Sequence, residues 1–211
     1  MTPKKQYFEN VAKTIIANLE KRQMEGYYCE DSEAAVKKVL EMIPEGASIS
    51  WGGTMTMTET GMMAALEKGS YTLIDRMLAK TPQERKELYA KAVCADYYFM
   101  STNAITLDGE LVNIDGFGNR VACLCAGPDY VMILAGMNKL VSTVEEGHDR
   151  VRNIAAPMNS VRLNKNTPCF TKGRCFECLS PECLCSQIVV TRRSHVPGRI
   201  KVFLIGEELG Y

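Results

Sequence analysis

The stretch Ser48-Ile49-Ser50-Trp51-Gly52-Gly53-Thr54-Met55-Thr56-Met57-Thr58-Glu59-Thr60-Gly61 decides the fold of this chain. Its first four residues form a short apolar run that is typical of a buried strand, and two adjacent glycines follow directly. Apolar spacing then predicts a helix from about residue 58 to 68. A strand that passes through a glycine turn into a helix is the repeating unit of α/β proteins.

The same alternation continues on both sides of this stretch. Apolar periodicity and capping residues predict helices at residues 4–24, 31–44 and 82–94. Short apolar runs predict strands at residues 27–29 and 71–74. We therefore predict an α/β fold with an open, mostly parallel, Rossmann-like sheet and helices on both faces.

The rest of the chain is predicted to contain more β-structure. Residues 97–107 and 111–114 are typical of a β-hairpin whose tight turn is Asp108-Gly109. A capping box predicts a helix at residues 143–155. Residues 157–186 are expected to be irregular. Further strands are expected at residues 121–126, 130–135, 187–191 and 200–205.

Length, composition and charge predict one domain with a small-molecule partner. The chain has 211 residues, of which 46% are hydrophobic and 24% charged, so it can bury a core. We expect residues 1–211 to form one domain with a cysteine-rich, metal-binding insertion at about 166–187. The 25 basic and 25 acidic residues cancel, which argues against nucleic acid or an anionic membrane as partner. A small anionic metabolite fits better, and a homodimer is the default assembly.

The sequence also predicts a cytoplasmic protein that does not span a membrane. The most apolar stretch, residues 121–138, is interrupted by Gly127-Pro128-Asp129, which is typical of a turn. The N-terminal segment has charged residues at helical spacing, unlike the core of a signal peptide. Nine cysteines without an export signal are expected to be free or bound to a metal.

The glycine turn is a candidate anion site. Gly52 and Gly53 let the backbone approach a ligand, and the hydroxyls of Thr54 and Thr56 add donors. The pattern lacks the lysine of a P-loop and differs from the Gly-x-Gly-x-x-Gly dinucleotide motif. An ordinary helix cap explains it equally well. Glu59 is a candidate general base or nucleophile, although an acid in a first helical turn more often complements the helix dipole.

Polar segments that follow other predicted strands are expected to converge on this turn, because parallel strands end at one edge of a sheet. Asp115, in a glycine-bearing loop, is the second candidate catalytic residue. Lys139 is a candidate partner for a substrate anion, with a solvated surface lysine as the alternative. The predicted ligand-binding residues of these segments are Thr102, Asn103, Asn113, Gly116, Gly118, Asn119, Asn138 and Lys139.

A cysteine cluster is the strongest chemical signal in the sequence. Residues 169–185 contain Cys169, Cys175, Cys178, Cys183 and Cys185. Thiolates at short spacing in a looped chain can complete a tetrahedral sulfur shell, which both zinc and an iron–sulfur cluster accept. The spacing does not choose between the two metals. Free thiols or a redox disulfide are the alternatives.

Four motifs in order resemble the LUD-domain (lactate utilisation) family, and the resemblance covers essentially the whole chain. They are Gly52-Gly53-Thr54-x-Thr56-x-x-Glu59-x-Gly61, Asp108-Gly109-Glu110-Leu111-Val112-Asn113-x-Asp115-Gly116-x-Gly118-Asn119-Arg120, Ala135-Gly136-Met137-Asn138-Lys139 and Gly206-Glu207-x-Leu209-Gly210-Tyr211. The resemblance implies a fold like that of NagB, RpiA and the CoA transferases, whose enzymes bind ligands at the strand ends.

The resemblance also implies a set of metal ligands. The chain is similar to a cysteine-bearing, stand-alone branch of the family at Cys169, Cys175, Cys178 and Cys185. Cys183 stands where a basic residue is expected in relatives. The fourth ligand is therefore either Cys185 or Cys183.

Three roles remain open from the sequence. Family members act with iron–sulfur partner subunits to oxidise L-lactate, which implies a role in the oxidation of L-lactate or a related 2-hydroxy acid. The alternative is a protein that binds a sugar phosphate, an acyl-CoA or a carboxylate, or an isomerase- or transferase-like enzyme, with a structural zinc. A purely structural subunit is a third option. The sequence does not decide whether the chain is itself an enzyme.

Overall fold

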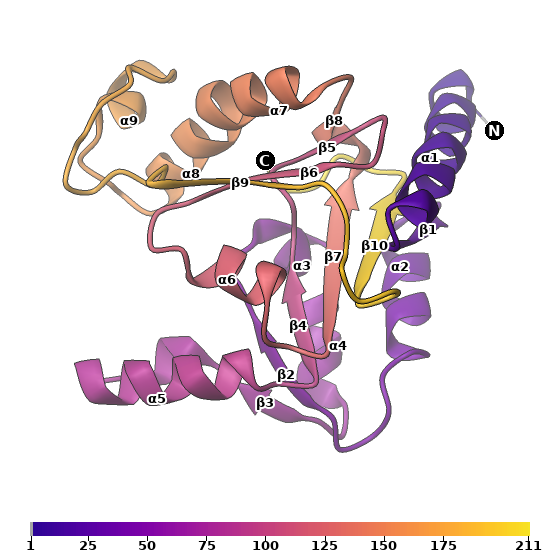
Figure 1. The fold of residues 1–211 in the computed structure, drawn as a ribbon, viewed down its shortest axis with the longest axis horizontal. Coiled ribbons are helices and arrows are strands. Elements are labelled where there is room, and N and C mark those ends of the chain that lie inside the picture. Colours follow the sequence, from indigo (N-terminus) through magenta and orange to yellow (C-terminus); the bar gives the residue numbers. More distant parts are fainter. Residues whose placement is uncertain (1) are drawn as a thin grey trace.

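The computed structural model describes residues 2–211, so residue 1 of the predicted domain lies outside the described part. Its centre is a six-stranded sheet in which all neighbouring strands are parallel (Figure 1). In spatial order the strands are β1 (Glu25–Cys29), β10 (Ile200–Ile205), β7 (Tyr130–Gly136), β4 (Tyr97–Met100), β2 (Ser48–Trp51) and β3 (Thr72–Ile74).

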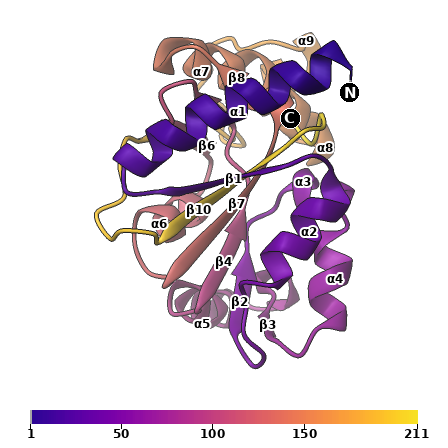
Figure 2. The ribbon, with the colours of Figure 1, turned by 90° about the vertical axis from the view of Figure 1, so that its right-hand side faces the viewer.

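Helices cover both faces of this sheet, which confirms the predicted fold class. One face packs against α1 (Pro3–Lys21), α5 (Pro82–Val93) and α6 (Asn119–Cys125). The other face packs against α2 (Ser32–Leu40), α3 (Met55–Glu59) and α4 (Met62–Lys68). Figure 2 shows α2 and α4 on one side of the strands and α6 on the other.

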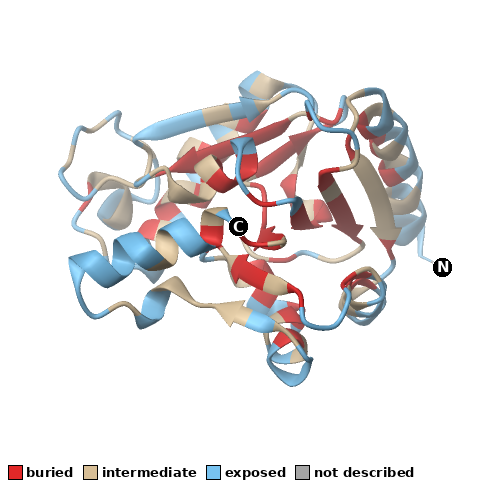
Figure 3. Cartoon of the chain, turned by 60° about the horizontal axis from the view of Figure 1, so that its bottom comes forward, coloured by how far each residue is buried: buried red, intermediate tan, exposed pale blue. Residues whose placement is uncertain are grey.

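Alternating side chains of the central strands build two separate cores. In β4, Tyr98 and Met100 join the core beneath α1, whereas Tyr97 and Phe99 join the core beneath α2. A parallel sheet covered on both faces requires such continuous apolar runs, because neither face contacts water. Figure 3 shows the buried residues concentrated in these strands and on the inner faces of the helices.

A second, smaller sheet lies beyond the carboxyl ends of the large one (Figure 1). Its order is β8 (Leu140–Val141), β5 (Ala104–Thr106), β6 (Leu111–Asp115) and β9 (Gln187–Thr191). β5 and β6 form the predicted antiparallel hairpin, and Gly109 in its turn has a φ of +83°. The predicted strand at residues 97–107 is wrong in one respect, because β4 and β5 belong to different sheets. The Thr102 hydroxyl donates to the Ala104 carbonyl oxygen at 2.8 Å where the chain leaves one sheet for the other.

The predicted strand at residues 121–126 is wrong, because this segment is helix α6. A short apolar run does not by itself distinguish a strand from a buried helix. The helix begins after Gly118, whose φ is +88°. The Asp115 carboxylate accepts the backbone N–H groups of Arg120 and Val121, at 3.2 and 3.3 Å, and so satisfies donors of the first turn.

The C-terminal end of α6 is bound by Arg199, a residue that is distant in the sequence. Arg199, only 9% exposed, donates to the carbonyl oxygens of Cys123, Leu124 and Pro128 at 2.7 to 2.9 Å. The last carbonyls of a helix have no partner within the helix, so the guanidinium satisfies groups that would otherwise be buried unpaired. This contact joins residues that are far apart in sequence, and no local pattern reveals it.

The predicted helix at residues 143–155 is longer than expected, and residues 157–186 are not wholly irregular. α7 (Val144–Arg150) continues through a π-helical turn, η3 (Val151–Ala155), into α8 (Ala156–Arg162). Pro157, in the first turn of α8, has no N–H, so a π turn ahead of it accommodates the missing bond. A further short helix, α9 (Pro168–Lys172), precedes the cysteine-rich loop.

Other bounds differ only slightly from the predictions. The helix predicted at 58–68 starts earlier and divides at Gly61, whose φ is +76°. Single 3-10 turns follow two strands, η1 (Arg76–Leu78) and η2 (Met137–Lys139). Within residues 2–211, no helix combines the length and apolar character needed to cross a membrane.

Replacing Arg199 tests the contact that fixes α6. We expect Arg199→Met to lower the free energy of unfolding by about 3 kcal/mol, because buried carbonyl oxygens lose a charged donor. Urea unfolding followed by circular dichroism measures this change. The exposed Arg193 provides the control, and Arg193→Met should change stability by less than about 0.5 kcal/mol. Equal unfolding midpoints for the two variants would show that the Arg199 contact contributes little.

Candidate functional site

A cavity of about 430 Å³ opens at the carboxyl ends of the large sheet's strands. Thr54 and Thr56 follow β2, Arg76 follows β3, and Lys139 follows β7. Parallel α/β sheets bind ligands at this edge. The wall comprises Gly53, Thr54, Met55, Thr56, Arg76, Met77, Ser101, Thr102, Asn103, Ile114, Asp115, Gly116, Phe117, Asn119, Arg120, Lys139, Asn159, Arg162, Leu163, Leu184, Gly210 and Tyr211.

Lys139 is the most unusual group in the wall, because its side chain is buried and forms no ion pair with any residue of the described range 2–211. The residue is 2% exposed, and its Nζ donates to Ser101 Oγ at 2.7 Å and to Thr56 Oγ1 at 3.0 Å. Burial, reinforced by the charges of Arg150 and Arg120, lowers the pKa of Lys139 to about 7, although Glu59 acts weakly in the opposite direction. The amine therefore titrates between its charged and uncharged forms near neutral pH.

Arg120 connects the two sheets beneath the cavity. Its Nη1 donates to the Ser101 carbonyl oxygen at 3.0 Å and to Asn113 Oδ1 at 2.6 Å. Its Nη2 donates to Asn103 Oδ1 at 2.9 Å and to the Ile114 carbonyl oxygen at 2.7 Å. Burial lowers the pKa of this guanidinium, but an arginine stays charged at any ordinary pH. The Nη1 and Nη2 groups of Arg120 are thus already hydrogen-bonded to other groups of the protein.

Gly52 is needed for this arrangement. A Cβ at position 52 would lie 3.0 Å from Arg120 Cδ and 3.4 Å from the hydroxyl of Tyr98. The glycine turn therefore lets the arginine side chain pass close beneath it. Gly52 itself does not line the cavity.

The Asp115 carboxylate lines the cavity, but its oxygens are occupied by the backbone. Oδ1 accepts the N–H groups of Phe117 and Gly118, at 3.1 and 2.7 Å, while Oδ2 accepts those of the first turn of α6. Arg120 Nε lies 3.7 Å from Oδ2. Asp115 thus shapes the loop and the start of the helix.

Basic side chains outnumber acidic ones in the wall. Of the side chains that the structure describes, Arg76, Arg120, Lys139 and Arg162 line the cavity, against the one side-chain carboxylate of Asp115. Arg76 Nε is buried and has no hydrogen-bond partner among residues 2–211. An unpaired buried donor is costly unless a ligand accepts from it. The electrostatics of the cavity therefore favour a small anion.

Glu59 lies outside this cavity, on an exposed part of α3. Its carboxylate accepts the Gly210 backbone N–H at 2.6 Å. Asn138 also binds this segment, because its Oδ1 accepts from Leu209 N at 3.1 Å and its Nδ2 donates to the Gly210 carbonyl oxygen at 3.2 Å. Together these side chains hold Leu209–Tyr211 against the cavity.

Most of the predicted ligand-binding residues meet at this cavity, and the remainder support it. Asn113 lies behind Arg120, Gly118 begins α6, and Gly52 and Asn138 have the positions described above. The predicted residues that line the wall are Gly53, Thr54, Thr56, Thr102, Asn103, Gly116, Asn119 and Lys139.

Three basic wall residues, Arg76, Arg120 and Arg162, were not among the predicted site residues. Arg120 closes the predicted glycine-bearing loop of Asp115. Arg76 follows β3 almost directly, so its place at a strand end was a signal that could have identified it. Arg162 is on α8, in the segment expected to be irregular, and no sequence signal points to it. Its Nη2 lies 3.9 Å from where a Cβ on Gly53 would stand, so α8 borders the glycine turn.

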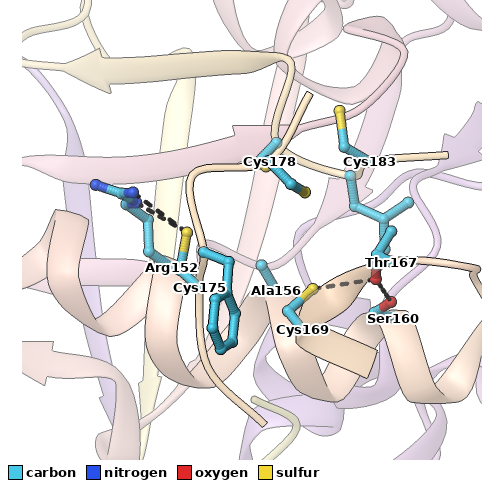
Figure 4. A pocket seen from close by; sticks show the side chains of 11 residues that line it. Arg152, Ala156, Ser160, Thr167, Cys169, Cys175, Cys178 and Cys183 are labelled. Carbon is cyan, nitrogen blue, oxygen red and sulfur yellow. Dashed lines mark hydrogen bonds between the residues drawn. The ribbon is translucent and has the colours of Figure 1, made fainter. Parts of the chain in front are cut away.

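The cysteine cluster surrounds a second, much smaller cavity of about 20 Å³ (Figure 4). Figure 4 shows the guanidinium of Arg152 turned toward Cys175, to which its Nε and Nη2 donate at 3.3 and 3.2 Å. The Glu177 backbone N–H donates to the same sulfur at 3.3 Å. The cysteines that line the cavity are Cys169, Cys175, Cys178, Cys183 and Cys185.

The environments of these thiols differ. Burial, with a contribution from the neighbouring cysteines, raises the pKa of Cys185 to about 11, whereas a hydrogen bond with Ser186 lowers the pKa of Cys183. Figure 4 shows the Cys183 sulfur pointing away from that of Cys169. Among the described residues, no three Cys, His, Asp or Glu side chains are positioned to hold one metal ion.

The two cavities share a wall. Leu184 lines both of them. A Cβ on Gly116 would lie 3.2 Å from the Cys183 carbonyl oxygen and from Leu184 Cα, so the cysteine-rich loop packs tightly on the Asp115 loop. The position of the cysteine-rich loop therefore shapes the larger cavity.

Comparison with protein families identifies the chain. A family model described as the LUD domain matches residues 12–205, nearly the whole sequence. The chain belongs to the LUD-domain family. This result confirms the resemblance carried by the sequence motifs.

A solved structure agrees with the fold of this LUD-domain protein. A DUF162 family protein from Deinococcus radiodurans matches it with a TM-score of 0.57 at 11% identity, covering 94% of this chain and 98% of that chain. At this identity the likeness concerns the fold alone. eIF2B delta from Chaetomium thermophilum matches with a TM-score of 0.36 at 18% identity, over 52% of this chain and 48% of that chain, and supports no argument. No curated protein matches the chain.

The buried amine makes the stability of this LUD-domain protein depend on pH. Because the pKa of Lys139 falls to about 7 on folding, the unfolded chain holds one more proton than the native one between pH 7 and about 10. Stability of the wild type should therefore rise with pH relative to Lys139→Met, by about 1.4 kcal/mol per pH unit at most. Urea unfolding at pH 7, 8 and 9 measures the difference.

The exposed Lys86 supplies the control for this experiment. The stability difference between wild type and Lys86→Met should stay constant over the same pH range. A constant difference for Lys139→Met as well would contradict the lowered pKa.

Proposed function

We propose that this LUD-domain protein binds a small carboxylate, a 2-hydroxy acid such as L-lactate, and takes part in its oxidation with iron–sulfur partner subunits. The observation that carries the proposal is the surplus of basic side chains at the strand ends. Arg76, Arg162 and Lys139 face the cavity, and the single acid in the wall is engaged by backbone N–H groups. A carboxylate there gains charge-assisted hydrogen bonds.

The free donors support this assignment more than the charge alone does. Arg120 has its guanidinium donors satisfied by the protein and acts as a fixed positive charge. Arg76 Nη2 donates to the Trp51 carbonyl oxygen at 3.2 Å, whereas its buried Nε has no partner within residues 2–211. The hydroxyls of Thr56 and Ser101 stand beside Lys139, where the hydroxyl group of a 2-hydroxy acid can exchange hydrogen bonds.

A sugar phosphate is the second candidate ligand, because of the size of the cavity. About 430 Å³ is more than a three-carbon acid fills, and it lies within the range of ordinary metabolite pockets. Phosphate also accepts hydrogen bonds from arginine. Direct competition between the two ligand classes decides between them.

Isothermal titration tests the binding proposal. We expect L-lactate or pyruvate to bind the wild type, and Arg76→Met to weaken binding roughly ten- to a hundredfold, because a charged hydrogen bond contributes about 1.5–3 kcal/mol. Arg85→Met, at an exposed position on α5, should bind like the wild type. Ribose 5-phosphate is titrated in parallel, and binding of this phosphate with no response to either carboxylate would replace the proposal by the second candidate.

The redox part of the proposal requires a separate assay. Lactate-dependent dye reduction is measured for iron–sulfur lactate-oxidation subunits with and without this protein. A rate that increases with the amount of added protein supports the role. A rate that does not change contradicts it, whatever the binding data show.

We further propose that the cysteine-rich loop binds a metal through thiolates, either zinc or an iron–sulfur cluster. The chemistry of the donor set fits such a group, because soft sulfur ligands line a single cavity with N–H donors directed at Cys175. Arg152 adds a positive charge beside an anionic sulfur shell. Cys169, Cys175, Cys178 and Cys185 are the proposed ligands, with Cys183 in place of Cys185 as the alternative.

Binding requires the loop to rearrange, since the sulfurs do not yet converge as ligands within residues 2–211. Zinc would fix the loop in place, whereas an iron–sulfur cluster would carry electrons. In both cases the role of the chain is to supply thiolates and to orient them through Arg152 and the backbone.

Metal and acid-labile sulfide are measured on protein purified without oxygen. We expect close to one metal centre per chain, and we expect Cys175→Ser to lose it. Cys94→Ser is the matched control, because Cys94 is an exposed cysteine outside the cluster and its replacement should leave the metal content unchanged. Iron with sulfide identifies a cluster and zinc without sulfide identifies a structural site. Absence of both after reconstitution with each metal would contradict the proposal.

A further inference from the structure

The amine of Lys139 is arranged as a nucleophile as well as a positive charge. Within residues 2–211 it forms no ion pair, and its recorded partners are the hydroxyls of Ser101 and Thr56. A lysine that only balances charge on the protein would face a carboxylate. Here the amine faces the cavity with one hydrogen-bonding position left over.

We infer that Lys139 forms an imine with the carbonyl carbon of a 2-oxo acid bound in the cavity. The inference rests on the proposed function, because the arginines that bind the carboxylate of a 2-hydroxy acid bind that of its oxidised form equally well. It goes further by assigning a covalent step and a nucleophile to the site.

The surroundings of the amine favour its uncharged form. Arg120 on α6 and Arg150 on α7 repel a positive charge at Nζ, and burial removes solvent from it. Glu59 on α3 is the acid that opposes them, but its carboxylate binds the Gly210 N–H group. With a pKa of about 7, roughly half of the amine is uncharged at neutral pH, against about one part in a few thousand for an ordinary lysine.

The segment that contains Gly210 packs against the amine of Lys139. Gly210 has a φ of +57°, and a Cβ there would lie 2.7 Å from Thr56 Oγ1 and 3.3 Å from Lys139 Nζ. The glycine therefore lets the backbone close over the amine and its hydroxyl partner. This packing limits the positions that Nζ can adopt.

The step balances without another reactant. The uncharged amine adds to the carbonyl carbon, the carbon–oxygen π bond breaks, and a proton moves from nitrogen to oxygen to give a carbinolamine. The carbinolamine then loses water, whose hydrogens both come from the amine, and leaves a carbon–nitrogen double bond. The Ser101 hydroxyl, 2.7 Å from Nζ, can carry the proton between the two atoms. No oxidant or reductant takes part.

The cavity selects the class of carbonyl compound. A 2-oxo acid places its carboxylate one bond away from the carbonyl carbon, so one molecule can meet an arginine and the amine together. Simple ketones lack the carboxylate, and 2-hydroxy acids lack the carbonyl. These differences define the probes for the test.

Borohydride trapping tests the inference on the full-length protein. Pyruvate with sodium cyanoborohydride should add to one site per chain, and the peptide containing Lys139 should gain the mass of pyruvic acid less one oxygen atom. Lys139→Met should lose this adduct, whereas Lys86→Met should retain it. Acetone and L-lactate, used in place of pyruvate, should give at least tenfold less adduct. The trapping rate should rise between about pH 6 and 8 and then level off, in contrast to an exposed lysine.

The outcomes separate this inference from the proposed function. If titration detects binding of L-lactate and pyruvate but no adduct forms at Lys139, the imine inference is wrong and the proposed function stands. Adducts spread over exposed lysines, and equal in Lys139→Met, would also overturn it. If neither acid binds and no adduct forms, both fail.

Discussion

The structure depends on one buried guanidinium. Arg120 donates to groups on Ser101 and Asn103 after β4, and to Asn113 and Ile114 of β6, so it joins the large sheet to the small one. A buried charge is tolerated only when its hydrogen bonds are satisfied, and here the surrounding carbonyl and amide oxygens supply them. The cavity lies directly above this junction, so its floor is set by the same bonds.

The positive field of the cavity follows from this arrangement. Because the Arg120 charge is solvated by neutral dipoles and only distantly paired with Asp115, much of it is left uncompensated. Burial, together with the charges of Arg150 and Arg120, lowers the pKa of Lys139. Arg76 Nε has no hydrogen-bond partner in the described part of the chain. Buried positive charge of this kind costs stability of the folded chain, and the proposed anion would offset that cost.

The sequence predicted the parts of the fold that are specified locally. Apolar runs gave the strands of the large sheet, and the glycine turn after Trp51 located the edge where the cavity opens. Helix α6 was missed because its short apolar run resembles a strand, and because Arg199, which binds its C-terminal carbonyl oxygens, is distant in the sequence. Arg162 was missed for a similar reason, since α8 extends beyond a proline that usually interrupts helices.

The sequence alone could not assign the roles of the candidate catalytic residues. Composition and loop type single out Glu59 and Asp115 equally, but only coordinates show that one binds Gly210 and the other a set of backbone N–H groups. Lys139 had no charge pattern to distinguish it from a surface lysine. Its burial results from residues of three distant segments closing around it.

Leu184 physically couples the two cavities. Its side chain belongs to the walls of both, so a displacement of the cysteine-rich loop alters the volume of the larger cavity. Thermodynamic linkage then applies in both directions: whatever factor an occupant of the cysteines adds to the affinity for the anion, the anion adds to the affinity for that occupant. The proposed occupant of the cysteines and the proposed anion would thus act on a common equilibrium.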